Sequence, residues 1–172
     1  MKHGLLTNGG TCSLLSTQQR LWYGGIISYH GTGRISVVED LMNKEKYVKD
    51  LESCVLFQMR DWFGKPQRGI FMKDGAPCHT AKVCSKFLQD KNIRKLPWSG
   101  NLPDLKPIEN IWSIVKHQVT SRTINTRQEM ISTILKCWFR DVTFVEKIRN
   151  CIDSMPEWLK AVISAKGGHT KF

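Results

Sequence analysis

The spacing of apolar and polar residues predicts two strands in the first quarter of the chain. An aromatic and β-branched run over Leu21–Tyr29 and a second run over Arg34–Val38 are each typical of a strand, and a turn over 30–33 would join them as a hairpin. The two glycines inside the first run predict a bulge or a close backbone approach. Residues 1–20 lack a sustained period, so we expect them to be irregular, with a weak strand over Cys12–Leu15.

Two helices and two short strands are predicted for the middle of the chain. Apolar residues recur near the helical period through Lys44–Phe63, and Asn43 can cap this helix. Ile70–Lys73 is predicted to be a short buried strand, and Ile93–Pro97 has the pattern of a further short strand. The segment between them, Thr80–Lys91, has a helical pattern.

The last third of the chain is predicted to be helical. Pro107 suits the first position of a helix. The apolar stripe of this helix is Ile108, Ile111, Trp112, Val115 and Val119. Three capping boxes predict three further helices that end near Gly167: Thr126/Glu129, Thr143/Glu146 and Ser154/Glu157. This order of elements predicts an α/β domain with a helical C-terminal third.

Composition narrows the class of partner. The 172 residues suit one domain, and 26 Lys and Arg against 15 Asp and Glu give a net charge of +11. That surplus suits a polyanion as partner, because each neutralised phosphate releases condensed counterions; a solvated basic surface is the alternative. No apolar run reaches the length of a membrane span and Met1–Ser16 lacks a signal pattern, so neither membrane insertion nor secretion is expected. Six cysteines without a C-x-x-C pair favour reduced thiols in cytosol or nucleus.

Two carboxylates lie where an α/β sheet binds ligands. Asp74 follows a short apolar run, and Glu109 lies in the first turn of the helix opened by Pro107, with 34 residues between the two acids. Ligands of α/β sheets bind beyond the carboxyl ends of the strands. The alternatives are a turn-forming Asp before Gly75 and a Glu placed favourably at a helix N-terminus.

The motifs around these acids resemble one family. DGAPCHTAK from residue 74 and LPWSGNLPDLKPIENIW from residue 96 are similar to the catalytic half of Tc/mariner superfamily transposases, which are DDE (Asp-Asp-Glu) enzymes. The resemblance includes WYGGIISYHGTGRISVVEDLMNKEKYVKDLE and NCIDSMPEWLKAVISAKGGHTKF, and so covers residues 22–172 as a partial catalytic domain. Residues 1–21 match poorly. The resemblance implies an α/β fold of the ribonuclease H-like (integrase/transposase) type, truncated at its N-terminus.

The resemblance also implies a catalytic site. Asp74 corresponds to the second carboxylate of the family and Glu109 to the third, as catalytic residues and ligands of Mg²⁺ or Mn²⁺. The first carboxylate ends the first strand in family members, about 90 residues earlier, which lies before the start of this chain. Asp40 and Asp50 are too close to Asp74 to replace it.

A missing first strand would leave two strands without backbone partners, because that strand is central in this fold. Buried unpaired backbone groups each cost about 1–3 kcal/mol. We therefore expect one of three outcomes: residues 2–21 supply a substitute strand, a partner chain supplies it, or the domain is poorly stable. The family's N-terminal helix-turn-helix region is not matched either.

Other residues near the acids are candidates for nucleic-acid contact. They are His79, Lys82, Asn110 and Lys116. For His79 the alternative is a local hydrogen bond, for the two lysines a solvated helix face, and for Asn110 a role in orienting the loop. Trp98 and Trp112 could stack on bases or pack in the core. Cys78 beside His79 could suggest a cysteine nucleophile, but no motif for an oxyanion hole accompanies it.

These patterns give the following hypotheses on function. The chain is transposase-derived, and its ancestral activity is metal-dependent DNA cleavage and strand transfer, impaired here by the missing first Asp; whether any enzymatic activity survives is open. The alternative is a non-catalytic basic module retained for binding DNA, and a third is a relic without function. We expect double-stranded DNA as partner, a homodimer as a candidate assembly, no membrane association, and a nuclear location.

Overall fold

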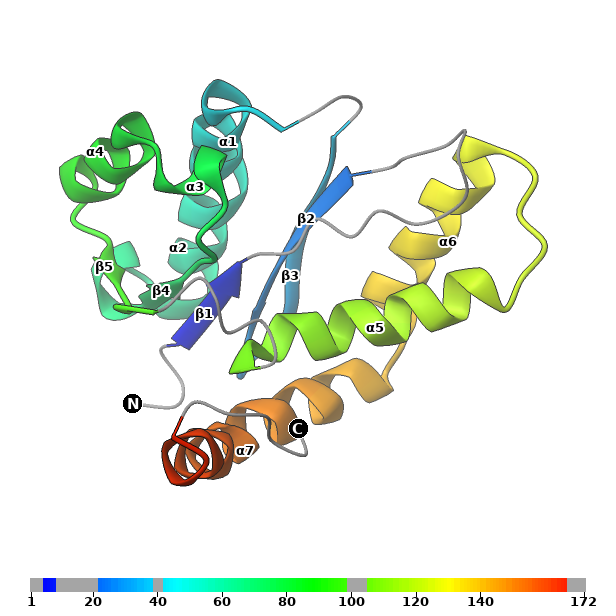
Figure 1. The fold of residues 1–172 in the computed structure, drawn as a ribbon. Helices are drawn as coiled ribbons and strands as arrows, with labels where there is room; N and C mark the ends of the chain where they lie inside the picture. Colours follow the sequence, from blue (N-terminus) through cyan, green and yellow to red (C-terminus); the bar gives the residue numbers. More distant parts are fainter. Residues whose placement is uncertain (1–4, 9–21, 39–41, 99–104, 167–172) are drawn as a thin grey trace.

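A five-stranded mixed sheet organises the domain in the computed structural model, which describes residues 5–8, 22–38, 42–98 and 105–166. The strand order is β3-β2-β1-β4-β5 (Figure 1). The strands are β1 (Leu5–Asn8), β2 (Trp22–Ser28), β3 (Gly31–Val38), β4 (Ile70–Met72) and β5 (Arg94–Lys95). β1, β2 and β3 pair in antiparallel fashion, whereas β1, β4 and β5 are parallel. The predicted hairpin is thus confirmed, but its turn lies at Tyr29 and His30 rather than over 30–33, because β3 already begins at Gly31.

The central strand of the sheet, β1, is a correction to the sequence analysis. Leu6 pairs with Ser28 of β2 on one side and with Phe71 of β4 on the other. The prediction of an irregular segment over residues 1–20 is therefore wrong for Leu5–Asn8. Four residues are too few to show a period, and it is the two flanking strands that give them their conformation. The sheet has its central strand; the weak strand predicted over Cys12–Leu15 lies outside the described residues.

The register of β2 and β3 shifts between Gly25 and Ile27, as the paired glycines predict. A Cβ atom on Gly25 would lie 2.6 Å from the Trp138 ring and 2.8 Å from the Trp112 ring. The bulge therefore coincides with a position where two indoles pack directly against the backbone. Only glycine leaves room for them.

The helices lie in the segments where the sequence predicts them, but several begin or end at other residues. They are α1 (Lys44–Asp50), a π-helical segment η2 (Leu51–Leu56), α2 (Phe57–Phe63), a 3₁₀ turn η3 (Pro66–Arg68), α3 (Pro77–Thr80), α4 (Lys82–Asp90), α5 (Pro107–Thr120), α6 (Arg127–Arg140) and α7 (Thr143–Ser164). α1, η2 and α2 form one continuous helical run over the predicted Lys44–Phe63. Asn43 caps it by accepting a hydrogen bond from the Lys46 amide.

One of the three predicted capping boxes forms. Thr126 and Glu129 cap α6 reciprocally, as expected. α7 has no side-chain cap and continues through Ser154 and Pro156 to Ser164, so the prediction of two helices in this stretch is wrong. The Ser154 hydroxyl donates to the Asn150 carbonyl inside the helix instead of capping a new one.

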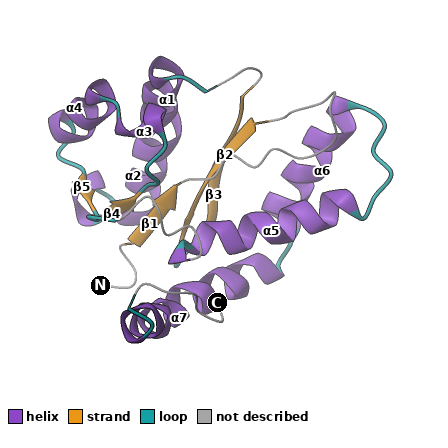
Figure 2. Cartoon of the chain, viewed as in Figure 1, coloured by secondary structure: helices purple, strands orange, loops and turns teal. Residues whose placement is uncertain are grey.

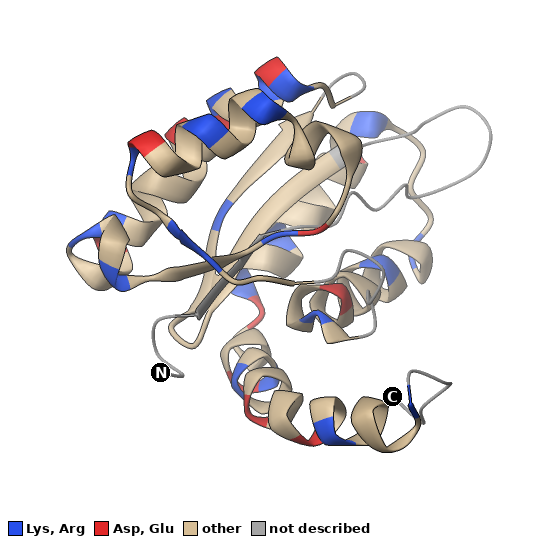
Figure 3. Cartoon of the chain, turned by 60° about the vertical axis from the view of Figure 1, so that its left-hand side comes forward, with Lys and Arg blue, Asp and Glu red and all other residues tan. Residues whose placement is uncertain are grey.

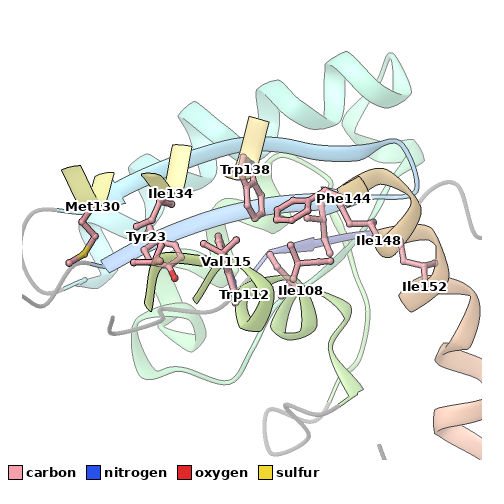
Figure 4. Packing of buried hydrophobic residues seen from close by; sticks show 13 residues of the cluster. Tyr23, Ile108, Trp112, Val115, Met130, Ile134, Trp138, Phe144, Ile148 and Ile152 are labelled. Carbon is pink, nitrogen blue, oxygen red and sulfur yellow. The ribbon is translucent and has the colours of Figure 1, made fainter. Parts of the chain in front are cut away.

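Helices cover both faces of the sheet, as Figure 2 shows. α1, η2, α2 and α4 pack on one face around Ile26, and α5, α6 and α7 pack on the other around Ile27. Consecutive strand residues point to opposite faces, which is why these two neighbours join different cores. In the second core, Trp112 stacks on Trp138 with ring centroids 4.6 Å apart (Figure 4). The Trp138 Nε1–H donates to the Gly33 carbonyl at 2.7 Å and ties α6 to β3.

The predicted class, α/β with a helical C-terminal third, is confirmed by this arrangement. Among the described residues, no helix combines the length and the apolar character that crossing a membrane requires.

Candidate active site

Asp74 lies two residues beyond β4, at the carboxyl end of that strand. Its Oδ1 accepts a hydrogen bond from the Ala76 amide at 3.0 Å, so Asp74 also forms the turn that its position before Gly75 suggests. The same oxygen pairs with the Nδ1 of His79. The side chain of Asp74 is 20% exposed and faces α5 through its other oxygen.

Glu109 is the third residue of α5, in the first helical turn. Pro107 begins the helix, and the Glu109 amide donates to the Lys106 carbonyl. The predicted core stripe of this helix is buried throughout: Ile108, Ile111, Trp112, Val115 and Val119. That packing fixes the rotation of α5 and directs Glu109 away from the core, toward Asp74.

A lysine that the sequence analysis missed lies between the two acids. The Lys106 Nζ is 3.5 Å from Asp74 Oδ2 and 3.5 Å from Glu109 Oε1, and its side chain is only 2% exposed. A buried ammonium group requires charged partners, and here two carboxylates provide them. The available signal was a lysine between Leu105 and Pro107, in an apolar stretch where a solvated lysine is out of place.

The electrostatics of Asp74 reflect these contacts. Partial burial raises the pKa of the Asp74 carboxyl, but the hydrogen bond and charge of His79, followed by the charge of Lys106, lower it by more. The net result is a pKa well below the ordinary value, so Asp74 is ionised throughout the neutral range. The site therefore contains ionised Asp74 and a cation already paired with it.

His79 is part of this centre rather than of the surface. Its ring is 5% exposed and stacks on Tyr47 with centroids 3.9 Å apart. The local hydrogen bond proposed as the alternative for His79 is the contact that forms, with Asp74 as partner. Burial, followed by the charge of Asp74, raises the pKa of Tyr47 well above its usual value, so the ring beneath His79 is an uncharged phenol.

The remaining candidates lie outside the centre. Lys82 at the start of α4, and Asn110 and Lys116 on α5, are exposed. The structure thus brings Asp74, His79 and Glu109 together with Lys106, and leaves the other three in solvent-facing positions.

Three further residues can be assigned to packing or excluded. Trp112 is buried in the core, as the packing alternative predicts, whereas Trp98 is half-buried against the cluster around Met72 and Trp158. Burial, followed by the charge of Asp74, raises the pKa of the Cys78 thiol, which opposes a nucleophilic role.

A groove of about 420 Å³ adjoins Asp74. Its lining comes from the ends of β4 and β5 and the loop after β5: Lys73, Asp74, Gly75, Thr80, Lys95, Leu96, Pro97 and Trp98. Burial lowers the pKa of Lys73, and the neighbouring charge of Lys95 lowers it further. Two lysines and an indole therefore line the groove beside the acid, an arrangement suited to phosphate and base contact.

Comparison with known proteins identifies the family. Residues 5–131 match the family model described as DDE superfamily endonuclease. The chain belongs to the DDE superfamily of endonucleases. The match begins at residue 5 and therefore includes β1. The motifs quoted from the sequence extend the resemblance only over residues 22–172, so the family model adds residues before them.

Individual relatives of this DDE domain are transposases. The transposable element Tcb2 transposase of Caenorhabditis briggsae is 27% identical over 135 residues, which cover 78% of this chain and 48% of the relative. The Tc1 transposase of Caenorhabditis elegans is 26% identical over 150 residues, covering 86% of this chain and 53% of the relative. The chain thus spans about half the length of these relatives. The expected resemblance to Tc/mariner transposases is confirmed, and the chain is transposase-derived.

Solved structures confirm the fold. The Mos1 transposase catalytic domain with raltegravir and Mn has a TM-score of 0.87 at 16% identity, covering 99% of this chain and 86% of that one. The Mos1 mariner paired-end complex with Mn has a TM-score of 0.83 at 17% identity, covering 99% and 58%. The predicted ribonuclease H-like fold is therefore confirmed.

Mos1 structures with Mn and with Mg support a divalent metal as the cofactor of this family. Among the residues that the structure describes, however, the space between Asp74 and Glu109 is not free for such an ion. Within the described residues, no group of three His, Cys, Asp or Glu side chains could together hold a metal ion. The space that faces both Asp74 and Glu109 contains the Lys106 ammonium group. β1 has the sequence Leu-Leu-Thr-Asn, so none of its four residues is a carboxylate.

Proposed function

We propose that this chain is a transposase-derived DNA-binding domain that keeps two acids of the DDE site but does not cleave DNA by itself. The observation that carries the proposal is the buried Lys106 ammonium group at 3.5 Å from both Asp74 and Glu109. Two-metal cleavage needs carboxylates that are free to bind metal ions about 3.5–4 Å apart. Here both acids are already paired with a protein cation.

The cofactor expectation is supported for the family, since Mos1 structures that share this fold are titled with Mg and with Mn. In this chain the first strand ends in Asn8, and Lys106 takes the position between the two remaining acids. We therefore assign no metal-dependent step to the chain as it stands.

DNA binding is supported by the net charge of +11 and by the groove beside Asp74. Lys73 is partly buried, and burial followed by the charge of Lys95 lowers the pKa of Lys73. A phosphate in the groove would relieve this repulsion and release condensed counterions. Lys and Arg are otherwise spread over several elements of the described chain (Figure 3), which leaves the groove as the best-defined contact.

Fluorescence anisotropy with a labelled DNA duplex tests binding. We expect affinity to fall as salt rises, and Lys73→Gln/Lys95→Gln to weaken binding and to reduce the salt slope by about 1–2. Lys160→Gln removes the charge of an exposed lysine of α7 that does not line the groove, and serves as the control. Asp74→Asn should leave affinity unchanged or higher. Salt-independent affinity would contradict phosphate contact.

A supercoiled-plasmid assay with Mg²⁺ or Mn²⁺ tests the absence of cleavage. We expect nicking no faster than that of the Glu109→Gln variant under conditions in which anisotropy shows bound DNA. Robust nicking that Glu109→Gln abolishes would contradict the proposal and favour a surviving nuclease.

The assembly and the location belong to the same proposal. We infer a homodimer on double-stranded DNA, supported by the paired-end complexes of the similar Mos1 structures. Light scattering of the domain with and without DNA tests it, and a mass of one chain per duplex would contradict it. A nuclear location follows from the DNA ligand, and imaging of a tagged chain checks it.

A further inference from the structure

We propose that Lys106 is a resident cation of the DDE site: it takes the place of a divalent metal, and removal of its charge opens the site to Mn²⁺. This inference rests on the proposed function, because it concerns the same pair of acids. It goes further in naming the residue that determines whether the site binds metal.

Lys106 lies where a metal ion shared by the two acids would bind. Both oxygens of the Asp74 carboxylate are engaged, Oδ1 by the Ala76 amide and His79, and Oδ2 by Lys106. A Mg²⁺ ion binds carboxylate oxygens at about 2.0–2.1 Å and tolerates little distortion. An ion shared by Asp74 and Glu109 would therefore lie against the Lys106 Nζ, which is within 3.5 Å of both acids.

The side chain of Lys106 is buried and has little freedom to move into solvent. The Lys106 side chain is 2% exposed, and the flanking Leu105, Pro107 and Ile108 are buried as well. An exposed lysine could turn into solvent when a metal arrives. Lys106 would have to leave a packed position at the start of α5, so a metal must compete with it directly.

The positive charge of Lys106 also compensates the negative charges of the two acids. Two buried or half-buried carboxylates require a cation, and Lys106 is the one that contacts both. Without its charge, the negative charges of Asp74 and Glu109 would no longer be compensated by a cation in contact with both. A divalent ion is the natural occupant of such a pair. Metal binding should therefore stabilise the variant fold by mass action.

Mn²⁺ binding without DNA tests the inference. Electron paramagnetic resonance of free Mn²⁺ gives the affinity, and the melting temperature with and without Mn²⁺ gives the linked stabilisation. Lys106→Met keeps the length of the side chain and removes its charge. We expect the variant to bind Mn²⁺ at least about tenfold more tightly than the wild type, because the lost charge lay at ion-pair distance from both acids. We also expect only the variant to melt higher with Mn²⁺.

Two control variants locate the effect. Lys160→Met makes the same change at a side chain that is 72% exposed on α7, and should bind Mn²⁺ as the wild type does. Lys106→Met/Glu109→Gln removes one of the acids and should lose the gain. A gain that survives in the double variant would place the metal elsewhere and overturn the inference.

A wild-type measurement keeps the test independent of variant folding. A tight, stoichiometric Mn²⁺ site in the wild type, lost in Asp74→Asn, would overturn the inference while leaving the DNA-binding proposal standing. If Lys106→Met does not fold without metal, Lys106→Gln, which can still donate hydrogen bonds to the acids, is measured in its place. Equal Mn²⁺ affinity of Lys106→Gln and the wild type would also overturn the inference.

Discussion

The side chain of Lys106 lies at the centre of the candidate site, between its two acids. The two acids keep the positions that the family motif implies, and α5 still aims Glu109 at Asp74. The lysine between them forms ion pairs with both acids, and the His79 ring lies at the edge of this network. Such a network holds the end of β4 to the start of α5.

A further partly buried acid, Asp50, gives a prediction about pH. Burial raises the pKa of Asp50, and hydrogen bonds from Ser36 and Cys54 lower it by less. The native state thus retains the proton to higher pH than the unfolded state, so ionised Asp50 costs stability above its native pKa. This cost disappears as pH falls below the unfolded value near 3.8.

Asp50→Asn should therefore be more stable than the wild type at pH 7, with an advantage that shrinks toward pH 4. Urea midpoints of both proteins at a series of pH values measure this. Asp61→Asn makes the same substitution at an exposed position of α2 and serves as the control. An advantage of the same size at every pH would contradict the account.

At the residue scale, the sequence reveals functional residues that belong to a recognisable motif. It does not reveal residues whose role depends on contact with a distant part of the chain. Asp74 and Glu109 follow from spacing and family resemblance. Lys106 stands inside the quoted motif, yet its role depends on a carboxylate 32 positions earlier in the chain. The burial of His79 likewise depends on Tyr47 from α1. Such contacts belong to tertiary structure and leave no periodic signal.

At the element scale, length decides what can be predicted. Helices with long apolar stripes, such as α5, appear in the sequence with their buried residues correctly assigned. β1 has four residues and takes its conformation from its two neighbours in the sheet. α7 shows the opposite error, because a hydroxyl and an acid three residues apart resemble a cap even inside a continuous helix.

The capping boxes offer a matched pair of variants. Thr126→Ala removes a hydroxyl that accepts from the Glu129 amide at the start of α6, and should lower the free energy of unfolding by about 1 kcal/mol. Thr143→Ala removes an exposed hydroxyl that only donates to Asp141, and should cost clearly less. Urea denaturation of both variants gives the comparison. If both variants lost the same free energy of unfolding, a specific contribution of the Thr126 cap to the stability of α6 would be contradicted.

At the scale of the whole domain, the sheet separates two cores and exposes its carboxyl edge, where the site lies. Of the three outcomes expected for a missing central strand, the first is the one found: residues near the N-terminus supply the strand. The fold is therefore that of a transposase catalytic domain with all five strands, although the chain spans about half the length of its curated relatives. Completeness of the sheet and occupation of the site by Lys106 are independent properties of this molecule.

A crystal of the wild-type domain soaked in Mn²⁺ tests the central claim most directly. An anomalous difference map locates manganese without reference to activity or DNA. The account predicts no peak between Asp74 and Glu109, with the Lys106 Nζ in ion-pair contact with both. A manganese peak bound to both carboxylates, with Lys106 displaced, would contradict it.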